Sequence, residues 1–257
     1  MVNQSLKEKY NFSDFTERHY RKLLKIAKKK YDFEFFHTNN KSPHVLWRHD
    51  VDFSAHRALR LAEIEHELDV KSTFFFRIHG EFYNIFEQPT YKKIQKIISL
   101  GHEIGIHFEY FFYDNIKSKS VLNQKLKFEK NILEKTFNVK IKAFSFHNPE
   151  MKNALRINEN KLVGMINTYG KSIKKKYHYC SDSMGYWRFE RLEDVLLSNI
   201  DKNLHVLTHP EWWQKTPMSP SLRFQRCVEK RADFCRATWK ATILNHKRMN
   251  EVWKGKW

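Results

Sequence analysis

The sequence contains little glycine, proline or cysteine. Only 7 glycines and 6 prolines occur among 257 residues, and no stretch resembles a Pro/Gly/Ser-rich linker, so we expect one domain spanning residues 1–257. The three cysteines are odd in number, widely spaced and without a CxxC pair. Neither a disulfide framework nor a cysteine zinc site is therefore indicated, and a reduced cytoplasm is the default location.

Long apolar segments are also missing. The first 15 residues contain no apolar run of the signal-peptide type, and nowhere do about twenty apolar residues follow one another, the length that a membrane span requires. These two absences favour a cytoplasmic protein.

Acidic residues are too few to balance the basic ones. Lys and Arg number 47 against 29 Asp and Glu, which gives a net charge of +18. Because 41% of the residues are hydrophobic, a substantial core can form beneath this basic surface. Anionic glycans, phospholipid head groups and nucleic acids are all attracted to such a surface. We expect at most weak contact with anionic membranes and no specific nucleic-acid partner, and the oligomeric state is not indicated.

The residues that are present alternate between strand and helix patterns. Residues 45–54 read as a buried strand, a turn and a helix capped by Ser54. Further strands are expected within 71–79, 101–110, 142–149, 165–169 and 204–213, with helices near 91–100 and 120–135. This alternation is typical of a parallel sheet with crossover helices.

Chemically capable side chains fall at the downstream ends of four of these strands: Asp50 and Asp52, His107, His147, and His209. The carboxyl ends of parallel strands meet at one edge, so these residues should gather at one mouth. Because side chains alternate along a strand, Asp50 and Asp52 point to the same face. Two negative charges held so close are costly, which favours a bound cation or a shared proton. The alternative is a helix-capping acid beside a surface acid. Each histidine could equally be a hydrogen-bonded structural residue, the role we assign to His49 and His102.

The segments RHDVD, STFFF, GHEIGIH, FSFHNP, a Ser-Asp-Ser…Trp stretch and LTHP occur in that order within residues 45–213. Together they resemble the polysaccharide deacetylase family (NodB-homology, carbohydrate esterase family 4), in particular its RHDVD-type branch found among surface-polysaccharide genes. The resemblance implies an α/β fold, a distorted (β/α) barrel resembling a TIM barrel. The core would span about residues 40–215, with an N-terminal helical extension over 1–39 and a basic C-terminal helical extension over 216–257.

The resemblance also implies a divalent metal, usually zinc, held by one Asp and two His. By the family pattern Asp50 is the general base, Asp52 is a metal ligand, and His107 matches the first ligand histidine. The second ligand histidine of the family would stand at residue 111, where this sequence has Phe111. The family's Arg-Pro-Pro-Tyr-like segment is replaced as well, so either another residue, with Arg48 as our candidate, supplies the missing arginine at the substrate, or no residue does.

His147 is our replacement for the missing metal ligand. A catalytic zinc keeps three protein ligands, and His147 ends an expected strand at the same mouth as Asp52 and His107. The following Asn-Pro turn would stop the strand and hold the imidazole at the rim. His79 and Glu109 are the rival ligands.

Catalysis needs a proton donor opposite the base, because an amine leaves poorly without a proton. His209 in LTHP is expected to fill this role. Asp182 in CSDSMGYW resembles the Asp of the family's Asp-and-Trp segment, and it would support His209 or the base. Trp187, Trp212 and Trp213 could stack on sugar rings, or could instead be ordinary core residues.

Both ends of the chain predict helices. Residues 13–31 predict a basic amphipathic helix that packs through Leu23, Leu24 and Ala27. Residues 221–257 predict a terminal helix that packs through Leu222, Cys227 and Phe234 and ends in a solvated basic tail.

The sequence thus predicts a carbohydrate deacetylase, a metal-dependent hydrolase that removes an N-acetyl or O-acetyl group from a sugar of a surface polysaccharide or its precursor. The absence of a signal peptide favours a precursor in the cytoplasm. One alternative is a catalytically silent glycan-binding or scaffold barrel, motivated by Phe111 and the missing arginine. A nucleic-acid-binding protein is a further alternative, and it rests on the +18 charge alone.

Overall fold

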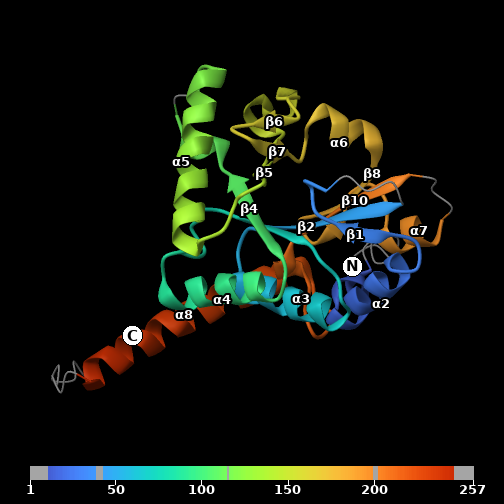
Figure 1. Cartoon of the computed structure of the whole chain (residues 1–257). Coiled ribbons are helices and arrows are strands. Elements are labelled where there is room, and N and C mark those ends of the chain that lie inside the picture. Colours follow the sequence, from blue (N-terminus) through green and yellow to red (C-terminus); the bar gives the residue numbers. More distant parts are fainter. Residues whose placement is uncertain (1–10, 39–42, 115, 199–201, 246–257) are drawn as a thin grey trace, which may run out of the picture.

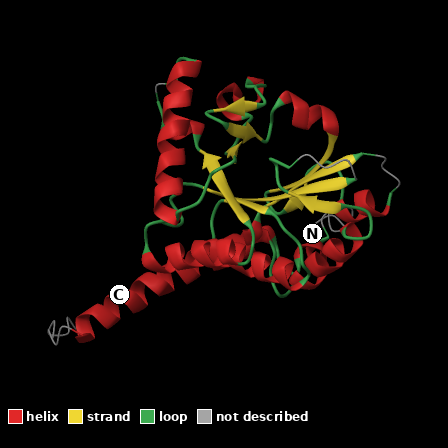
Figure 2. Ribbon diagram, in the orientation of Figure 1, coloured by secondary structure: helices red, strands yellow, loops and turns green. Residues whose placement is uncertain are grey.

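The computed structural model describes residues 11–38, 43–114, 116–198 and 202–245. A curled ten-stranded sheet forms its centre (Figures 1 and 2). Its strands are β1 (Asp32–Glu34), β2 (His44–Val51), β3 (Thr73–Phe76), β4 (Glu103–Phe108), β5 (Ala143–Phe146), β6 (Lys161–Leu162), β7 (Met165–Asn167), β8 (Tyr177–Ser183), β9 (Tyr186–Trp187) and β10 (Asn203–Thr208).

The strand order is β6-β7-β5-β4-β3-β2-β10-β8-β9, and β1 pairs with the first residues of β2. Most pairs are parallel, while β6 and β9 add an antiparallel strand at each end of the order. A curled parallel sheet with external helices is a distorted (β/α) barrel, so the predicted fold class is confirmed.

Helices surround the curled sheet (Figure 1). They are α2 (Glu17–Ala27), α3 (Ala55–Glu67), α4 (Gln88–Ser99), α5 (Lys119–Phe137), α6 (Lys171–Lys176), α7 (Leu192–Leu197) and α8 (Pro220–Asn245), with 3₁₀ turns η1 (Phe12–Phe15), η2 (Tyr110–Phe112), η3 (Met151–Arg156) and η4 (Pro210–Trp212). None of the helices in the described part of the chain has the length and apolar character needed to span a membrane.

Local capping fixes where the first two helices begin. Ser54 accepts a hydrogen bond from the backbone N–H of Arg57 and starts α3, as the sequence predicts. Thr16 caps α2 by accepting from the N–H of His19, three residues later than the start expected at position 13. The apolar face expected for this helix is buried in the core.

Two expectations for the terminal extensions differ from the structure. β1 joins the sheet, so the sheet begins before the core boundary that the sequence placed near residue 40. In α8, Leu222 and Phe234 stay exposed at 54% and 37%, and the expectation that they pack inward is wrong. Residues 1–10 and the expected basic tail over 246–257 lie outside the described residues.

Arg223, and not the apolar residues of α8, anchors this helix to the body of the protein. Its side chain is fully buried and donates hydrogen bonds to the carbonyl oxygens of Gly185 and Phe12, at 3.1 and 3.2 Å. The guanidinium also lies 4.9 Å from the ring of Phe15. A long arginine side chain can bury its stem and still satisfy its charged end.

A buried carboxylate ties β2 to the helices outside the barrel. Glu65 on α3 lies 2.7 Å from the ring nitrogen of His49 and accepts hydrogen bonds from the hydroxyls of Ser72 and Tyr20. The other ring nitrogen of His49 contacts the hydroxyl of Thr208 at 2.7 Å. All five side chains are buried, so the network joins α2, α3, β2 and β10 in the interior of the protein.

This network accounts for two histidines that we assigned structural roles. His49 faces outward on β2, away from the aspartates, and His102 contacts the hydroxyl of Ser72 at 3.1 Å and the carbonyl oxygen of Ala62 at 3.0 Å. Burial alone would raise the pKa of Glu65, but the two histidines outweigh burial and lower it. Glu65 is therefore the anion on which the buried network depends.

We expect Glu65→Gln to lower the free energy of unfolding by about 3–5 kcal/mol, because it removes one partner from a buried ionic network. Glu67→Gln on the same helix is the matched control. Glu67 forms a half-exposed ion pair with Arg21, so its loss should lower stability by less than about 1 kcal/mol. Urea unfolding of both variants measures the difference, and equal effects would contradict the structural role of Glu65.

Candidate active site

Strands β2, β4 and β5 deliver reactive side chains to one end of the barrel, with β3 lying between β2 and β4. Asp50 lies on β2 with Asp52 just past its end, and His107 lies on β4. His107 pairs in register with Ser145 on β5, so His147 follows two residues further on the same face. The backbone N–H of His147 donates to the carbonyl oxygen of Phe108, which holds the imidazole at the rim.

Asp52, His107 and His147 converge on one point. Oδ1 of Asp52 lies 3.2 Å from Nε2 of His107 and 3.8 Å from Nε2 of His147. Ligand atoms about 2.0–2.1 Å from a tetrahedral zinc lie roughly 3.4 Å from one another, so this spacing fits a divalent ion. Oδ1 of Asp52 is buried and accepts no hydrogen bond within the described chain, which leaves it available as a ligand.

Glu109 is the partner of the candidate ligand His147. Its Oε1 lies 3.5 Å from Nδ1 of His147 and accepts a hydrogen bond from Arg77. Burial would raise the pKa of Glu109, but His147 and Arg77 outweigh burial and lower it to about 2. A carboxylate at the second nitrogen of a ligand histidine orients the ring and increases its basicity.

The remaining rival ligand, His79, points elsewhere. Its ring stacks on Phe112 with centroids 3.5 Å apart, and Nε2 contacts the hydroxyl of Tyr113 at 3.1 Å. His79 also lies 3.5 Å from Glu129, and it does not line the pocket that contains Asp52.

Asp50 is a buried acid in which one carboxylate oxygen accepts hydrogen bonds and the other accepts none from the described residues. Oδ2 accepts hydrogen bonds from Ser145 at 3.0 Å and Arg48 at 3.2 Å, and it lies 3.7 Å from Nε2 of His107. Oδ1 is buried without a hydrogen-bond partner among the described residues. A fixed carboxylate with a free oxygen can accept a proton from a water molecule.

Arg48 has a different role from the one that the sequence suggested. We expected it to contact substrate, but it is fully buried and does not line the pocket. Its guanidinium instead binds Asp50 and donates a 2.7 Å hydrogen bond to the hydroxyl of Tyr169. Because side chains alternate along β2, Arg48 points into the barrel on the same face as Asp50 and directly below it. Arg48 therefore acts as a positioning residue for the Asp50 carboxylate.

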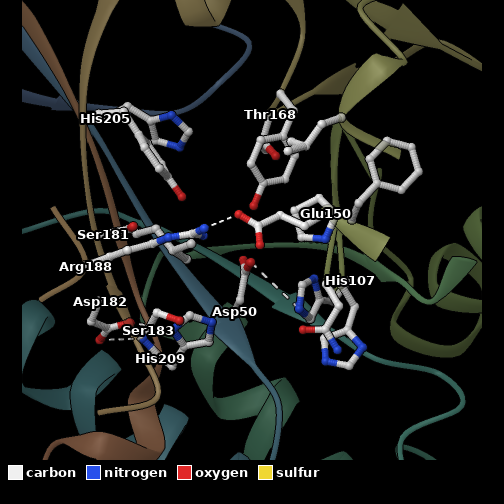
Figure 3. A pocket seen from close by; sticks show the side chains of 18 of the residues that line it. Asp50, His107, Glu150, Thr168, Ser181, Asp182, Ser183, Arg188, His205 and His209 are labelled. Carbon is white, nitrogen blue, oxygen red and sulfur yellow. Dashed lines mark hydrogen bonds and ion pairs between the residues drawn. The ribbon is translucent and has the colours of Figure 1, made fainter. Parts of the chain in front are cut away.

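His209 lies on the other side of Asp52, with Nε2 3.8 Å from Oδ2 of that carboxylate. Its Nδ1 is hydrogen-bonded to Asp182, which also accepts from the backbone N–H of His209 (Figure 3). Burial would lower the pKa of His209, but the Asp182 carboxylate outweighs burial and raises it well above its ordinary value. A protonated His209 can donate through Nε2.

The site opens into a pocket of about 350 Å³. Besides the acids and histidines, aromatic side chains line it, namely Phe146, Tyr169, Tyr177, Tyr179 and Phe189. Arg188 and Glu150 form an ion pair across the pocket (Figure 3). Aromatic walls with a few charged groups are typical of a pocket for a small polar ligand.

The tryptophans expected to stack on sugar are core residues. Trp212 and Trp213 are 6% and 0% exposed, and neither lines the pocket. Trp187 stacks on Phe15 with ring centroids 5.3 Å apart and is also absent from the pocket wall. All three indoles pack in one apolar cluster that also contains Phe15 of η1 and Tyr20 of α2.

Sequence reasoning missed Ser145, Tyr179 and the supporting role of Glu109. Period-two alternation could have identified two of them, because Ser145 precedes His147 by two residues and Glu109 follows His107 by two. Tyr179 lies in β8, which we did not predict as a strand.

No family model and no curated protein matches this chain. Among solved structures, a mutant CE4 family pseudoenzyme with restored enzymatic activity shares 17% identity over 76% of this chain and 64% of its own, with a TM-score of 0.45. The wild-type CE4 family pseudoenzyme from Bacillus anthracis shares 18% identity over 76% of this chain and 62% of its own, with a TM-score of 0.42.

The chitin deacetylase from the fungal pathogen Colletotrichum lindemuthianum shares 16% identity over 73% of this chain and 81% of its own, with a TM-score of 0.43. This chain thus spans less than two thirds of the pseudoenzyme's length. The two pseudoenzyme structures belong to CE4, the family that the sequence motifs of this chain resemble. The assignment to the RHDVD-type branch stays a prediction. Because all three likenesses are distant, we base the function on the geometry of this chain.

If His147 is a metal ligand, His147→Ala should weaken zinc binding by more than Glu109→Gln, which removes only the partner of the ligand and should weaken it about 10–100-fold. His79→Ala is the control, because His79 contacts Tyr113 and Phe112 and should leave affinity unchanged. Competition with a chelator measures affinity without substrate. A loss on His79→Ala but not on His147→Ala would reverse the assignment.

Proposed function

We propose that this protein is a metal-dependent carbohydrate deacetylase of the polysaccharide deacetylase family. It would remove an acetyl group from the amine or hydroxyl of a sugar. One observation carries the proposal: a ligand set of one carboxylate and two imidazoles lies between a buried acid, Asp50, and a protonated histidine, His209.

The chain supplies a separate group for each proton transfer. Oδ1 of Asp50 is free to accept a proton from the attacking water, while Arg48 and Ser145 hold Oδ2 in place. His209 would donate a proton to the departing amine or alcohol, and Asp182 keeps that imidazole protonated and oriented. A base and an acid on opposite sides of the reacting carbonyl are what amide hydrolysis requires.

Asp52, His107 and His147 would hold the divalent ion, and we propose zinc because imidazole and carboxylate ligands suit it. When bound, the ion supplies polarisation of the acyl carbonyl and acidification of water. With three protein ligands, a coordination position stays open for substrate, whereas a fourth protein ligand would give a purely structural site.

The proposed substrate is an acetylated sugar, because aromatic walls surround the reactive groups and sugar rings pack well on aromatic faces. We further propose that it belongs to a precursor of a surface polysaccharide in the cytoplasm. Phe111 removes one ligand position known from the family pattern, and His147 offers an imidazole in its place. That replacement favours an enzyme over a silent glycan-binding barrel.

The first test measures metal content and acetate release, with Asp50→Asn as the diagnostic variant. The amide retains the shape of the side chain but cannot accept the proton, so turnover should fall about 10²–10⁴-fold. Zinc affinity should stay within a few fold, because Asp50 is not among the three proposed ligands. A wild-type protein that binds glycans but releases no acetate from varied acetylated sugars would support the silent barrel instead.

A second test uses the leaving group to isolate the role of His209. Asp182→Asn should leave the imidazole neutral and poorly oriented, so hydrolysis of an N-acetyl sugar should slow about 10²–10⁴-fold. An aryl acetate has a leaving group that needs no proton, and its hydrolysis should slow far less. Equal losses on both substrates would show that Asp182 supports the site as a whole and not proton donation by His209.

A further inference from the structure

A second groove, of about 320 Å³, lies between α3, α4 and α8. It shares no lining residue with the candidate active site. Figure 1 shows α8 passing α3 and α4 before its C-terminal part extends beyond the body. We call this feature the α8 groove.

Positive charge dominates the lining of the α8 groove. Five cationic side chains line it against one carboxylate, and they are Arg57, Lys93, Arg226, Lys230 and Arg231, facing Glu87. Arg57 is paired with Glu17 outside the groove, and Arg231 is paired with Glu87. The other three have no carboxylate within ion-pair distance in the part of the chain that the structure describes.

The pKa values of His56 and Lys93 reflect the same excess of positive charge. Burial lowers the pKa of His56, and the cations Arg57, Lys93 and Lys230 lower it further. Burial also lowers the pKa of Lys93, where Arg231 adds to the shift and Glu87 opposes it. Cations held this close repel one another until an anion joins them.

Two helix N-termini open into the same groove. Ser54 and Ala55 begin α3, and Pro89 and Thr90 form the first turn of α4. These helices contain 13 and 12 residues, long enough for their dipoles to place partial positive charge at the groove. The dipoles add to the side-chain charges and favour an anion.

Aromatic side chains form the apolar part of the groove. Phe53 and Phe82 pack edge to face with ring centroids 4.6 Å apart, and Tyr83 and Phe234 complete the lining. Phe234 is 37% exposed, so the described chain leaves part of its ring uncovered. Basic and aromatic groups together suit a ligand that has a phosphate at one end and an apolar or planar body at the other.

We propose that the α8 groove binds a phosphate ester that carries an apolar or aromatic body. Either a nucleoside diphosphate or a phospholipid headgroup provides this chemistry. Phe53 and Ser54 follow Asp52 directly, so the groove is connected to the candidate active site by the β2–α3 turn. The proposal does not depend on deacetylase activity.

The diagnostic variant is Arg226→Gln/Lys230→Gln. Both side chains are exposed, so the double variant should fold normally. The matched control, Lys127→Gln/Lys135→Gln, removes the same charge from exposed positions on α5. Isothermal titration with uridine diphosphate, and sedimentation with vesicles of phosphatidylcholine with or without phosphatidic acid, separate the two sources of phosphate.

Saturable binding of uridine diphosphate in solution would assign a nucleotide, and binding only to vesicles that contain phosphatidic acid would assign a lipid headgroup. In either case the double variant should bind about tenfold more weakly or worse, the loss expected for charge-assisted hydrogen bonds, while the control matches wild type. Binding of neither probe, or equal weakening in both double variants, would overturn the proposal. Because these measurements involve no turnover, a failure here leaves the proposed deacetylase untouched.

Discussion

The whole site depends on a single buried strand that carries charge on both faces. β2 is buried along its full length, yet it contains Arg48, His49 and Asp50 in succession. Charges taken out of water destabilise a fold unless partners satisfy them. On the inner face Arg48 forms an ion pair with Asp50, and on the outer face Glu65 pairs with His49. Both the register of β2 and the position of α3 are thereby constrained.

The outer network bears on function although it touches no substrate. Glu65 and Thr208 hold His49 between them, and this fixes β2 relative to β10. Asp50 comes from β2 and His209 follows β10, so the distance between the proposed base and acid depends on that pairing. A catalytic pair must be positioned to within a fraction of an ångström, and buried networks provide that rigidity.

The proposed metal ligands illustrate how a barrel could tolerate the loss of a ligand residue. All three side chains project from the carboxyl ends of β2, β4 and β5, which are close in the sheet order. A ligand missing from the loop after β4 can therefore be supplied by the end of β5, at nearly the same point in space. Glu109 follows β4 directly and lies against His147, so in the proposed site it would orient that imidazole. Chemistry at strand ends is set by position in the sheet more than by sequence spacing.

The sequence by itself determined the strands that end at the site (β2, β4, β5 and β10), the helix start at Ser54 and the residues at those strand ends, because side-chain alternation and capping are local properties. Tertiary structure decided which partner each side chain meets. Arg48 turned out to hold Asp50 because both point into the barrel, and Trp212 became a core residue because η4 packs against α3 and α8. Likewise, Arg223 rather than Leu222 anchors α8, because carbonyl oxygens from distant parts of the chain accept its hydrogen bonds. Such contacts join residues far apart in the chain, so no local pattern in the sequence encodes them.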